Sequence, residues 1–216
     1  MNETTVALTD YVLVVECAAF AIALARTRAP SPERLAWLAF FGATACAALL
    51  GGTVHGFFAS ETSRVGAALW TATMLAIGVT GWSTLALAAR FELDERLASL
   101  VIRVGLVELA GYAVAVLCVT QAYWLALAQY APFGALWLAV LARAYARRRD
   151  RVTLLGLIGL GLSFVAAAIQ FFHVAITSIR LDHNSLYHLV QMAGLALLFA
   201  FARARLAVRA GVARGT

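Results

Sequence analysis

Long apolar stretches separated by short polar segments run through most of the chain. Seven of them are long enough to cross the hydrocarbon layer of a membrane as a helix, which takes roughly 20 residues. Most show no amphipathic helical period, and none shows the alternation that is typical of the strands of an outer-membrane barrel. The pattern predicts an all-α fold, a seven-transmembrane-helix bundle. Its helices are expected at about residues 9–26, 35–58, 65–89, 97–119, 121–145, 152–176 and 183–205.

The composition agrees with a protein that is embedded in lipid. Hydrophobic side chains make up 63% of the 216 residues and charged ones 13%, and the mean hydropathy is +0.86. A soluble domain has roughly half of its residues apolar and about a quarter charged, so a soluble fold is excluded. The length is taken up by the seven helices and short loops, which predicts a single integral membrane domain over residues 1–216.

Arginine supplies every basic charge of the chain. All 17 basic residues are Arg, and the formal net charge is +6. The absence of lysine excludes a retinal protein of the rhodopsin type, because its Schiff base needs a lysine amine. The arginines collect in the loops between helices, where they are expected to set the orientation of the chain, and no nucleic-acid partner is expected.

The positions of the arginines predict this orientation. Basic residues are enriched on the cytoplasmic side of a membrane protein. We therefore expect the amino terminus outside and the carboxyl terminus in the cytoplasm, in a bacterial cytoplasmic (inner) membrane. Most of the arginines lie on the predicted inner side, at Arg26, Arg28, Arg34, Arg90, Arg96, Arg143, Arg147, Arg148, Arg149, Arg151, Arg203, Arg205, Arg209 and Arg214, whereas Arg64 and Arg180 lie on the outer side.

All four histidines are predicted to lie on the outer side. His55 is near the end of the second helix, His173 is near the end of the sixth, and His183 and His188 open the seventh. Imidazole is the commonest metal ligand in proteins, and catalytic zinc typically has three protein ligands and a water. We therefore expect the four histidines to contribute to a zinc site. The alternative is that they are interfacial side chains that hydrogen-bond to loop carbonyls.

Polar residues near His188 extend this candidate site. Asn184, His188 and Gln191 fall on one helical face at spacings of four and three, so Asn184 and Gln191 are candidates to support a bound metal or cofactor. Asp182 or Asn184 is a candidate N-cap of the last helix, and Asp182 is also a candidate catalytic group. Glu16, in the outer half of the first helix, is a second candidate for acid–base chemistry.

Glu108 is a further carboxyl group within a predicted helix, near the middle of the fourth. It is a candidate for a proton relay or for cation binding. The alternative is an interhelical hydrogen bond, for example with Tyr112, and its role stays open.

These histidine positions, together with seven helices, resemble the CREST superfamily of seven-helix membrane metal hydrolases, which includes alkaline ceramidases and the adiponectin/progestin receptors. The resemblance implies zinc-dependent hydrolysis of lipid amides. It implies that His55 is the zinc ligand of the second helix, and that His188 is the second histidine of a His-x-x-x-His motif whose first position is Asn184 here. The chain is also similar to uncharacterised bacterial seven-helix membrane proteins that share the Asp-His-Asn-x-Leu-Tyr-His-Leu stretch, residues 182–189.

The sequence thus leads to one main hypothesis and two alternatives. The main hypothesis is a zinc-dependent integral membrane hydrolase that acts on a lipid amide or ester from the outer leaflet, where the metal activates a bound water. The first alternative is an accessory or structural subunit of a membrane complex without catalytic activity. The second is a haem-binding membrane protein with histidine ligands to the iron. Membrane lipids are expected partners in each case, while protein partners and a homo-oligomer remain open.

Overall fold

The computed structural model describes residues 3–27, 31–58, 63–176 and 181–212, and it folds them into seven long α-helices. Each of these helices is long and apolar enough to cross a membrane. In this described part of the chain, the strand-like structure is a single bridge between Ile176 and Leu181. The described part of the protein is therefore all-α, with seven helices that could each span a membrane. Its helices are α1 (Glu3–Ala25), α2 (Pro32–Thr53) with the π-helix η1 (Val54–Phe58), α3 (Arg64–Glu92), α4 (Glu95–Cys118), α5 (Tyr123–Arg148), α6 (Arg151–Phe171) and α7 (His183–Val212).

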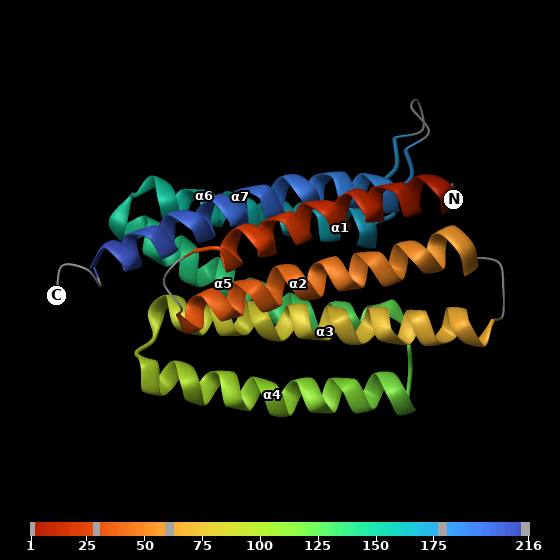
Figure 1. Ribbon diagram of the computed structural model, residues 1–216, viewed down its shortest axis with the longest axis horizontal. Helices are drawn as coiled ribbons and strands as arrows, with labels where there is room; N and C mark the ends of the chain where they lie inside the picture. Colours follow the sequence, from red (N-terminus) through yellow and green to blue (C-terminus); the bar gives the residue numbers. More distant parts are fainter. Residues whose placement is uncertain (1–2, 28–30, 59–62, 177–180, 213–216) are drawn as a thin grey trace.

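Six of the seven helices form a ring, and α4 lies outside it. Around the ring, α1 contacts α2, α2 contacts α3, α3 contacts α5, α5 contacts α6, α6 contacts α7, and α7 returns to α1. The remaining helix, α4, packs against the outer side of α3, at one edge of the bundle in Figure 1. The ring arrangement places the first and last helices side by side, so residues far apart in sequence share one site.

The two ends of the bundle differ in their charged residues. The arginine end contains the carboxyl ends of α1, α3, α5 and α7, and the histidine end is the opposite one (Figure 1). At the arginine end, Arg205 of α7 donates to both carboxylate oxygens of Glu33 of α2, at 2.8 and 3.2 Å. Its guanidinium also lies 4.3 Å from the ring centroid of Phe91 in α3. Arg28, Arg180 and Arg214 lie outside the described residues.

The arginine half of the ring is filled by aromatic side chains. Trp37 of α2 is 1% exposed, and its ring lies 5.5 Å from that of Trp137 in α5. Phe20 of α1 stacks on Phe199 of α7 with ring centroids 4.2 Å apart. Such contacts bury large apolar areas and fix the helices against one another. The space that remains between the helices lies in the histidine half.

Small residues bring α6 and α7 together. A Cβ placed on Gly159 would lie 2.8 Å from the carbonyl oxygen of Gly194, and the reverse distance is also 2.8 Å. Backbones approach this closely in membranes only where both helices present small residues. A Cβ on Gly161, two positions further along α6, would meet no atom within 4 Å.

Most predicted helix boundaries agree with the structure, but the end of the sixth helix does not. The apolar run predicts a helix to residue 176, whereas α6 ends at Phe171. His173 follows in the left-handed conformation, with φ of 54°. The Val174 amide donates to the Ile169 carbonyl at 3.0 Å and the His173 amide to the Gln170 carbonyl at 3.4 Å. These are the two bonds of a Schellman motif, so the apolar residues after it leave the helix.

Two further boundaries differ because the helices extend beyond the predicted stretches. The first helix begins at Glu3, whereas the apolar pattern predicts a start near residue 9, and α7 continues to Val212 instead of ending near 205. The second helix is not uniform either, because its last turn is the π-helix η1. A π-turn is rare and is often found at functional sites, and this one contains His55.

Candidate functional site

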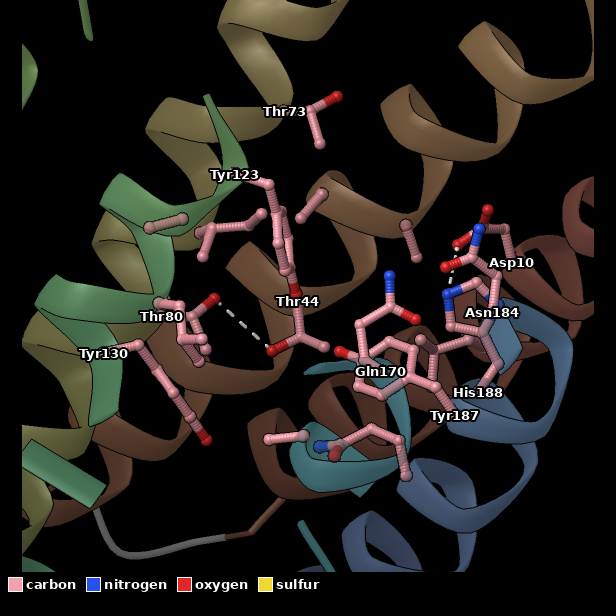
Figure 2. Close-up of a pocket in the computed structure, with 18 of the residues that line it drawn as sticks. Asp10, Thr44, Thr73, Thr80, Tyr123, Tyr130, Gln170, Asn184, Tyr187 and His188 are labelled. Atoms are coloured by element: carbon pink, nitrogen blue, oxygen red, sulfur yellow. Dashed lines mark hydrogen bonds and ion pairs between the residues drawn. The ribbon is translucent and has the colours of Figure 1, made fainter. Parts of the chain in front are cut away.

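A cavity of about 540 Å³ lies inside the ring, in its histidine half. Its volume falls in the range of roughly 300–1,000 Å³ that is typical of small-molecule sites. All six helices of the ring contribute to its wall, and much of that wall is aromatic or aliphatic. Figure 2 shows Asp10, Asn184, Tyr187 and His188 together on one side and Tyr130 on the other. The apolar and aromatic lining residues include Phe40, Trp70, Ile77, Tyr123, Tyr130 and Phe171.

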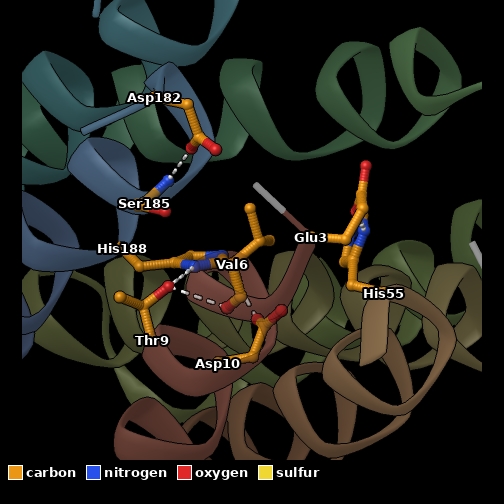
Figure 3. A network of polar contacts seen from close by, with 8 residues as sticks. All are labelled: Glu3, Val6, Thr9, Asp10, His55, Asp182, Ser185 and His188. Atoms are coloured by element: carbon orange, nitrogen blue, oxygen red, sulfur yellow. Dashed lines mark hydrogen bonds and ion pairs between the residues drawn. The ribbon is translucent and has the colours of Figure 1, made fainter. Parts of the chain in front are cut away.

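Asp10 of α1 and His188 of α7 form a buried pair on this wall. The Nε2 atom of His188 lies 3.2 Å from Oδ1 of Asp10, and the two residues are 8% and 4% exposed. The other ring nitrogen, Nδ1, lies 2.8 Å from the hydroxyl oxygen of Thr9. Thr9 in turn donates its hydroxyl proton to the Val6 carbonyl, at 2.8 Å. Figure 3 shows this row of contacts.

The hydrogen bonds of Thr9 determine where protons lie in the pair. Because the Thr9 hydroxyl proton goes to the backbone, Thr9 accepts from Nδ1 of His188, which therefore carries a proton. The contact between Nε2 and Asp10 then needs one more proton, which either group can hold. In both arrangements the pair has no net charge. Asp10 and His188 can therefore hold and transfer a proton beside the cavity without placing a net charge in its buried wall.

Glycines in α2 and η1 make room for α1 beside the pair. A Cβ on Gly52 would lie 2.7 Å from the Cβ of Asp10, and a Cβ on Gly56 would lie 3.3 Å from that of Ala7. The glycines around His55 therefore accommodate a neighbouring helix. This close approach places the Asp10 carboxyl between α2 and α7.

The four predicted histidine ligands occupy different surroundings. His55, in η1, lies 3.0 Å through Nδ1 from Oε2 of Glu3 and lines the cavity. His173 also lines it, and its ring centroid is 4.6 Å from that of His183, the first residue of α7. His188, the fourth, has partners on both nitrogens.

The donor set of the described residues does not match a three-ligand zinc site. Among them, no group of three or more His, Cys, Asp or Glu side chains is placed to hold a metal ion. Instead, His188 contacts Thr9 and Asp10, and His55 contacts Glu3. Zinc and haem therefore stay predictions from the sequence.

The polar face predicted for the last helix lies toward the cavity, while its role stays a prediction. Asn184, His188 and Gln191 are all buried and all line the cavity. The Nε2 amide of Gln191 donates to the Ser163 hydroxyl at 3.4 Å, across the close contact between α6 and α7. Asp182 caps α7, because its Oδ1 accepts from the Ser185 amide at 2.8 Å. The predicted catalytic role of Asp182 stays untested.

The two other predicted carboxyl groups lie outside the cavity wall. Oε2 of Glu16 is buried without a hydrogen-bond partner in the described part of the chain. Glu108 accepts from Nε2 of Gln129 in α5 at 3.3 Å. Tyr112, suggested above as its partner, donates instead to the Met74 carbonyl at 2.9 Å. An interhelical hydrogen bond of Glu108 is thus present, but the example of Tyr112 was wrong.

Sequence reasoning missed Asp10 and a group of hydroxyls in the cavity wall. Asp10 falls inside the apolar first helix, where an ionisable residue is itself a signal of a site. The hydroxyls come from three helices, and Thr73 and Thr80 lie two turns apart on one face of α3. Sequence spacing relates residues on one helix but not on different helices, so it does not show that these groups meet. The hydroxyl side chains of this group are Thr44, Thr73, Thr80 and Ser163.

Residues 5–207 match a protein family described as a family of unknown function, DUF6962. The chain belongs to this family. The match covers almost the whole ring, and every residue of the cavity wall falls within it. Comparisons with curated proteins and with solved structures gave no match. Membership of this family assigns no chemistry to the protein. The likeness to the CREST superfamily remains a resemblance.

Proposed function

We propose that this protein binds an amphipathic small molecule in the cavity of its helix ring. The observation that carries the proposal is the Asp10–His188 pair on the cavity wall. Ionisable side chains are costly in a membrane, and those that occur there usually face an interior site and have a functional role. The rest of the wall is largely aromatic and aliphatic, as in most small-molecule sites. An elongated ligand with an apolar body and one polar end matches both parts of this wall.

The proposal includes an orientation and an entrance. The arginine end faces the cytoplasm of a bacterial inner membrane, and the histidine end faces outward, in agreement with the distribution of basic residues. Phe171 and Trp124 line the cavity near the histidine end, and both are 62% exposed. His173, beside Phe171, is also exposed and lines the cavity. The ligand therefore enters near the outer ends of α5 and α6, from the outer leaflet or from the outside.

A cavity-filling substitution tests the proposal. Ala167 of α6 lines the cavity, so Ala167→Phe occupies part of its volume. Ala110→Phe adds the same side chain to an exposed position on α4 and serves as the control. The measurement is native mass spectrometry of small molecules that remain bound to the detergent-purified protein. We expect a bound species with the wild type and Ala110→Phe that is lost with Ala167→Phe. Equal occupancy in all three proteins, or none in the wild type, contradicts the proposal.

Hydrolysis of a lipid amide or ester is the second candidate function. It is favoured by the proton that Asp10 and His188 share beside the cavity, because such a pair can act as a general base and return the proton to a leaving group.

The hydrolase candidate is tested with lipid amides and esters incubated with purified protein, and products are detected by mass spectrometry. Activity lost in Asp10→Asn and His188→Gln supports it, whereas no product from the wild type argues for binding alone. Metal analysis and a visible absorption scan of the same sample test zinc and haem. Co-purification of a protein partner in stoichiometric amount would support the accessory-subunit alternative instead.

A further inference from the structure

We propose that the polar end of the bound molecule is an amine, held at Asp10 as an ammonium group. This inference rests on the proposed function and specifies its ligand. It follows from an imbalance of hydrogen-bonding groups in the cavity wall. Two buried oxygens of the wall have no partner among the described residues, and the serine and threonine oxygens there have already donated their protons, so all of these atoms can only accept.

The serine and threonine hydroxyls of the wall donate their protons elsewhere. Thr44 donates to the Phe40 carbonyl at 2.8 Å, Thr73 to Leu69 at 2.9 Å, and Thr80 to Ala76 at 3.2 Å. Ser163 donates to the Gly159 carbonyl, also at 3.2 Å. Each of these bonds returns to the residue four positions earlier in the same helix. A hydroxyl that has given its proton to the backbone offers only lone pairs to a ligand.

Two buried oxygens of the wall have no hydrogen-bond partner in the part of the chain that the structure describes. These are Oδ2 of Asp10 and Oε1 of Gln170. An unsatisfied buried acceptor costs roughly 1–3 kcal/mol, and more when it is charged. Both atoms are satisfied by a ligand that donates hydrogen bonds. An ammonium group suits such a wall because it has up to three donors and no acceptor.

Among its described residues, the wall lacks the permanently charged cations that usually bind an anionic ligand. No arginine is among the described lining residues, and the chain has no lysine. A carboxylate or phosphate head would therefore enter without an arginine or lysine partner, at a high desolvation cost. The rings of Trp70, Tyr123 and Tyr187 line the same cavity, and aromatic faces attract a cation.

The Asp10–His188 pair also allows the amine to enter without a charge. A neutral amine partitions through the lipid and takes up the one proton that the pair shares. The new N–H bond forms on the amine nitrogen as the bond to Oδ1 or Nε2 breaks. Nδ1 of His188 keeps its proton and still donates it to the Thr9 oxygen, and Asp10 is left as a carboxylate beside the ammonium. The total charge of the site is the same before and after binding.

Three amphiphiles of equal chain length test the inference. Dodecylamine, dodecanol and dodecanoic acid are titrated against the detergent-purified protein, and binding is followed by quenching of tryptophan fluorescence, since Trp70 and Trp124 line the cavity. We expect the amine to bind at least about tenfold more tightly than the alcohol, which corresponds to one charge-assisted hydrogen bond. The acid should bind most weakly. The quenching measured with Ala167→Phe gives the background from amphiphile that dissolves in the detergent.

Variants assign the amine preference to the two unpartnered oxygens. Asp10→Asn should lower the affinity for the amine to that for the alcohol, and Gln170→Leu should lower it severalfold. Thr71→Val is the control, because the Thr71 hydroxyl donates to the Ala67 carbonyl and Thr71 does not line the cavity. If Asp10→Asn fails to fold, as judged by thermal unfolding, the inference is tested by Gln170→Leu and by the affinities of the wild type for the three amphiphiles.

The outcomes separate the two proposals. If the alcohol or the acid binds as tightly as the amine, and Ala167→Phe abolishes that binding, the cavity is a binding site and the amine inference is wrong. If no amphiphile binds more tightly to the wild type than to Ala167→Phe, and no native ligand is retained, the proposed function itself fails. An amine preference that survives in both Asp10→Asn and Gln170→Leu also overturns the inference.

Discussion

Nε2 of His188 lies 3.2 Å from Oδ1 of Asp10, so the last helix of the bundle is joined to the first by a buried ionisable pair. The residues that form it are 178 positions apart in the chain, and the contact exists because the ring returns from α7 to α1. The same pair forms part of the cavity wall. One interaction therefore connects the closure of the ring with the proposed binding site.

Removal of either member of the pair should destabilise the protein. Asp10→Ala and His188→Ala each leave a buried ionisable group without its partner, which costs about 3–5 kcal/mol. The double variant removes both groups, so its loss should be smaller than the sum of the single losses, with a coupling of about 1–3 kcal/mol. The measurement is thermal or denaturant unfolding in detergent. Strictly additive losses would show that the two groups do not interact.

The Glu3–His55 pair is the matched control for this cycle. It has a similar length, 3.0 Å, but its side chains are 34% and 26% exposed. Exposed ion pairs contribute about 0–1 kcal/mol, so the coupling between Glu3→Ala and His55→Ala should be below about 1 kcal/mol.

Gly52→Ala should separate α1 from α2 at the site. The new methyl group would lie 2.7 Å from the Cβ of Asp10, so one of the helices must shift. Overpacking of this kind costs about 1–3 kcal/mol, and it should also weaken ligand binding because Asp10 moves. Gly42→Ala in the same helix meets no atom within 4 Å. It should stabilise the protein by about 0.5–1 kcal/mol, and a loss in both variants would instead indicate a general intolerance of α2.

The helices could be predicted from the sequence, but the way they meet could not. Apolar stretches of membrane length gave all seven helices, because lipid burial imposes that length on each one separately. Asn184, His188 and Gln191 could be placed on one face because their spacing lies within one helix. Asp10 was missed because its partner, His188, lies on another helix, and the order of helices around a ring leaves no periodic signal when most faces are apolar.

The misplacement of His173 has a different cause. Hydropathy continues past Phe171 without interruption, so it predicts a longer helix. The helix ends through two backbone hydrogen bonds and a left-handed residue, and the usual sequence signal for this motif is glycine. With histidine at that position, the signal is absent from the sequence.

At the arginine end, Arg205→Ala should cost more than the loss of an exposed ion pair. The Glu33 side chain is 4% exposed and receives two hydrogen bonds from Arg205, whose guanidinium also faces Phe91. The expected loss is about 3 kcal/mol, and Arg205→Lys should recover only part of it because lysine lacks the planar fork. Arg147→Ala, which breaks the more exposed pair with Glu92, should cost below about 1 kcal/mol. Equal losses of stability in Arg205→Ala and Arg147→Ala would contradict the expectation that the more buried ion pair contributes more.

Asp150, between α5 and α6, should make the stability of the protein sensitive to acid. Burial raises the pKa of its carboxyl, but hydrogen bonds from the Thr153 amide and hydroxyl and the nearby charge of Arg148 outweigh it, so the pKa lies below its ordinary value. A lowered pKa gives stability that is present above the unfolded-state value, about 3.9, and is lost as the pH falls through the folded-state value. Asp150→Asn keeps an N-cap without a charge. Its unfolding midpoint should therefore fall less than that of the wild type on acidification below about pH 4, and parallel curves would contradict this assignment.

His173→Gly should make the protein more stable. A side chain other than glycine in the left-handed conformation costs roughly 1–2 kcal/mol, and the Schellman motif at the end of α6 holds His173 there with φ of 54°. Glycine removes that cost, whereas His173→Ala removes the imidazole and keeps the strain. If the imidazole has no further role, His173→Gly unfolds at a higher temperature than the wild type and His173→Ala does not. If both variants also lose the bound amphiphile or metal, the strained histidine is retained for the site, as strained residues at functional sites often are.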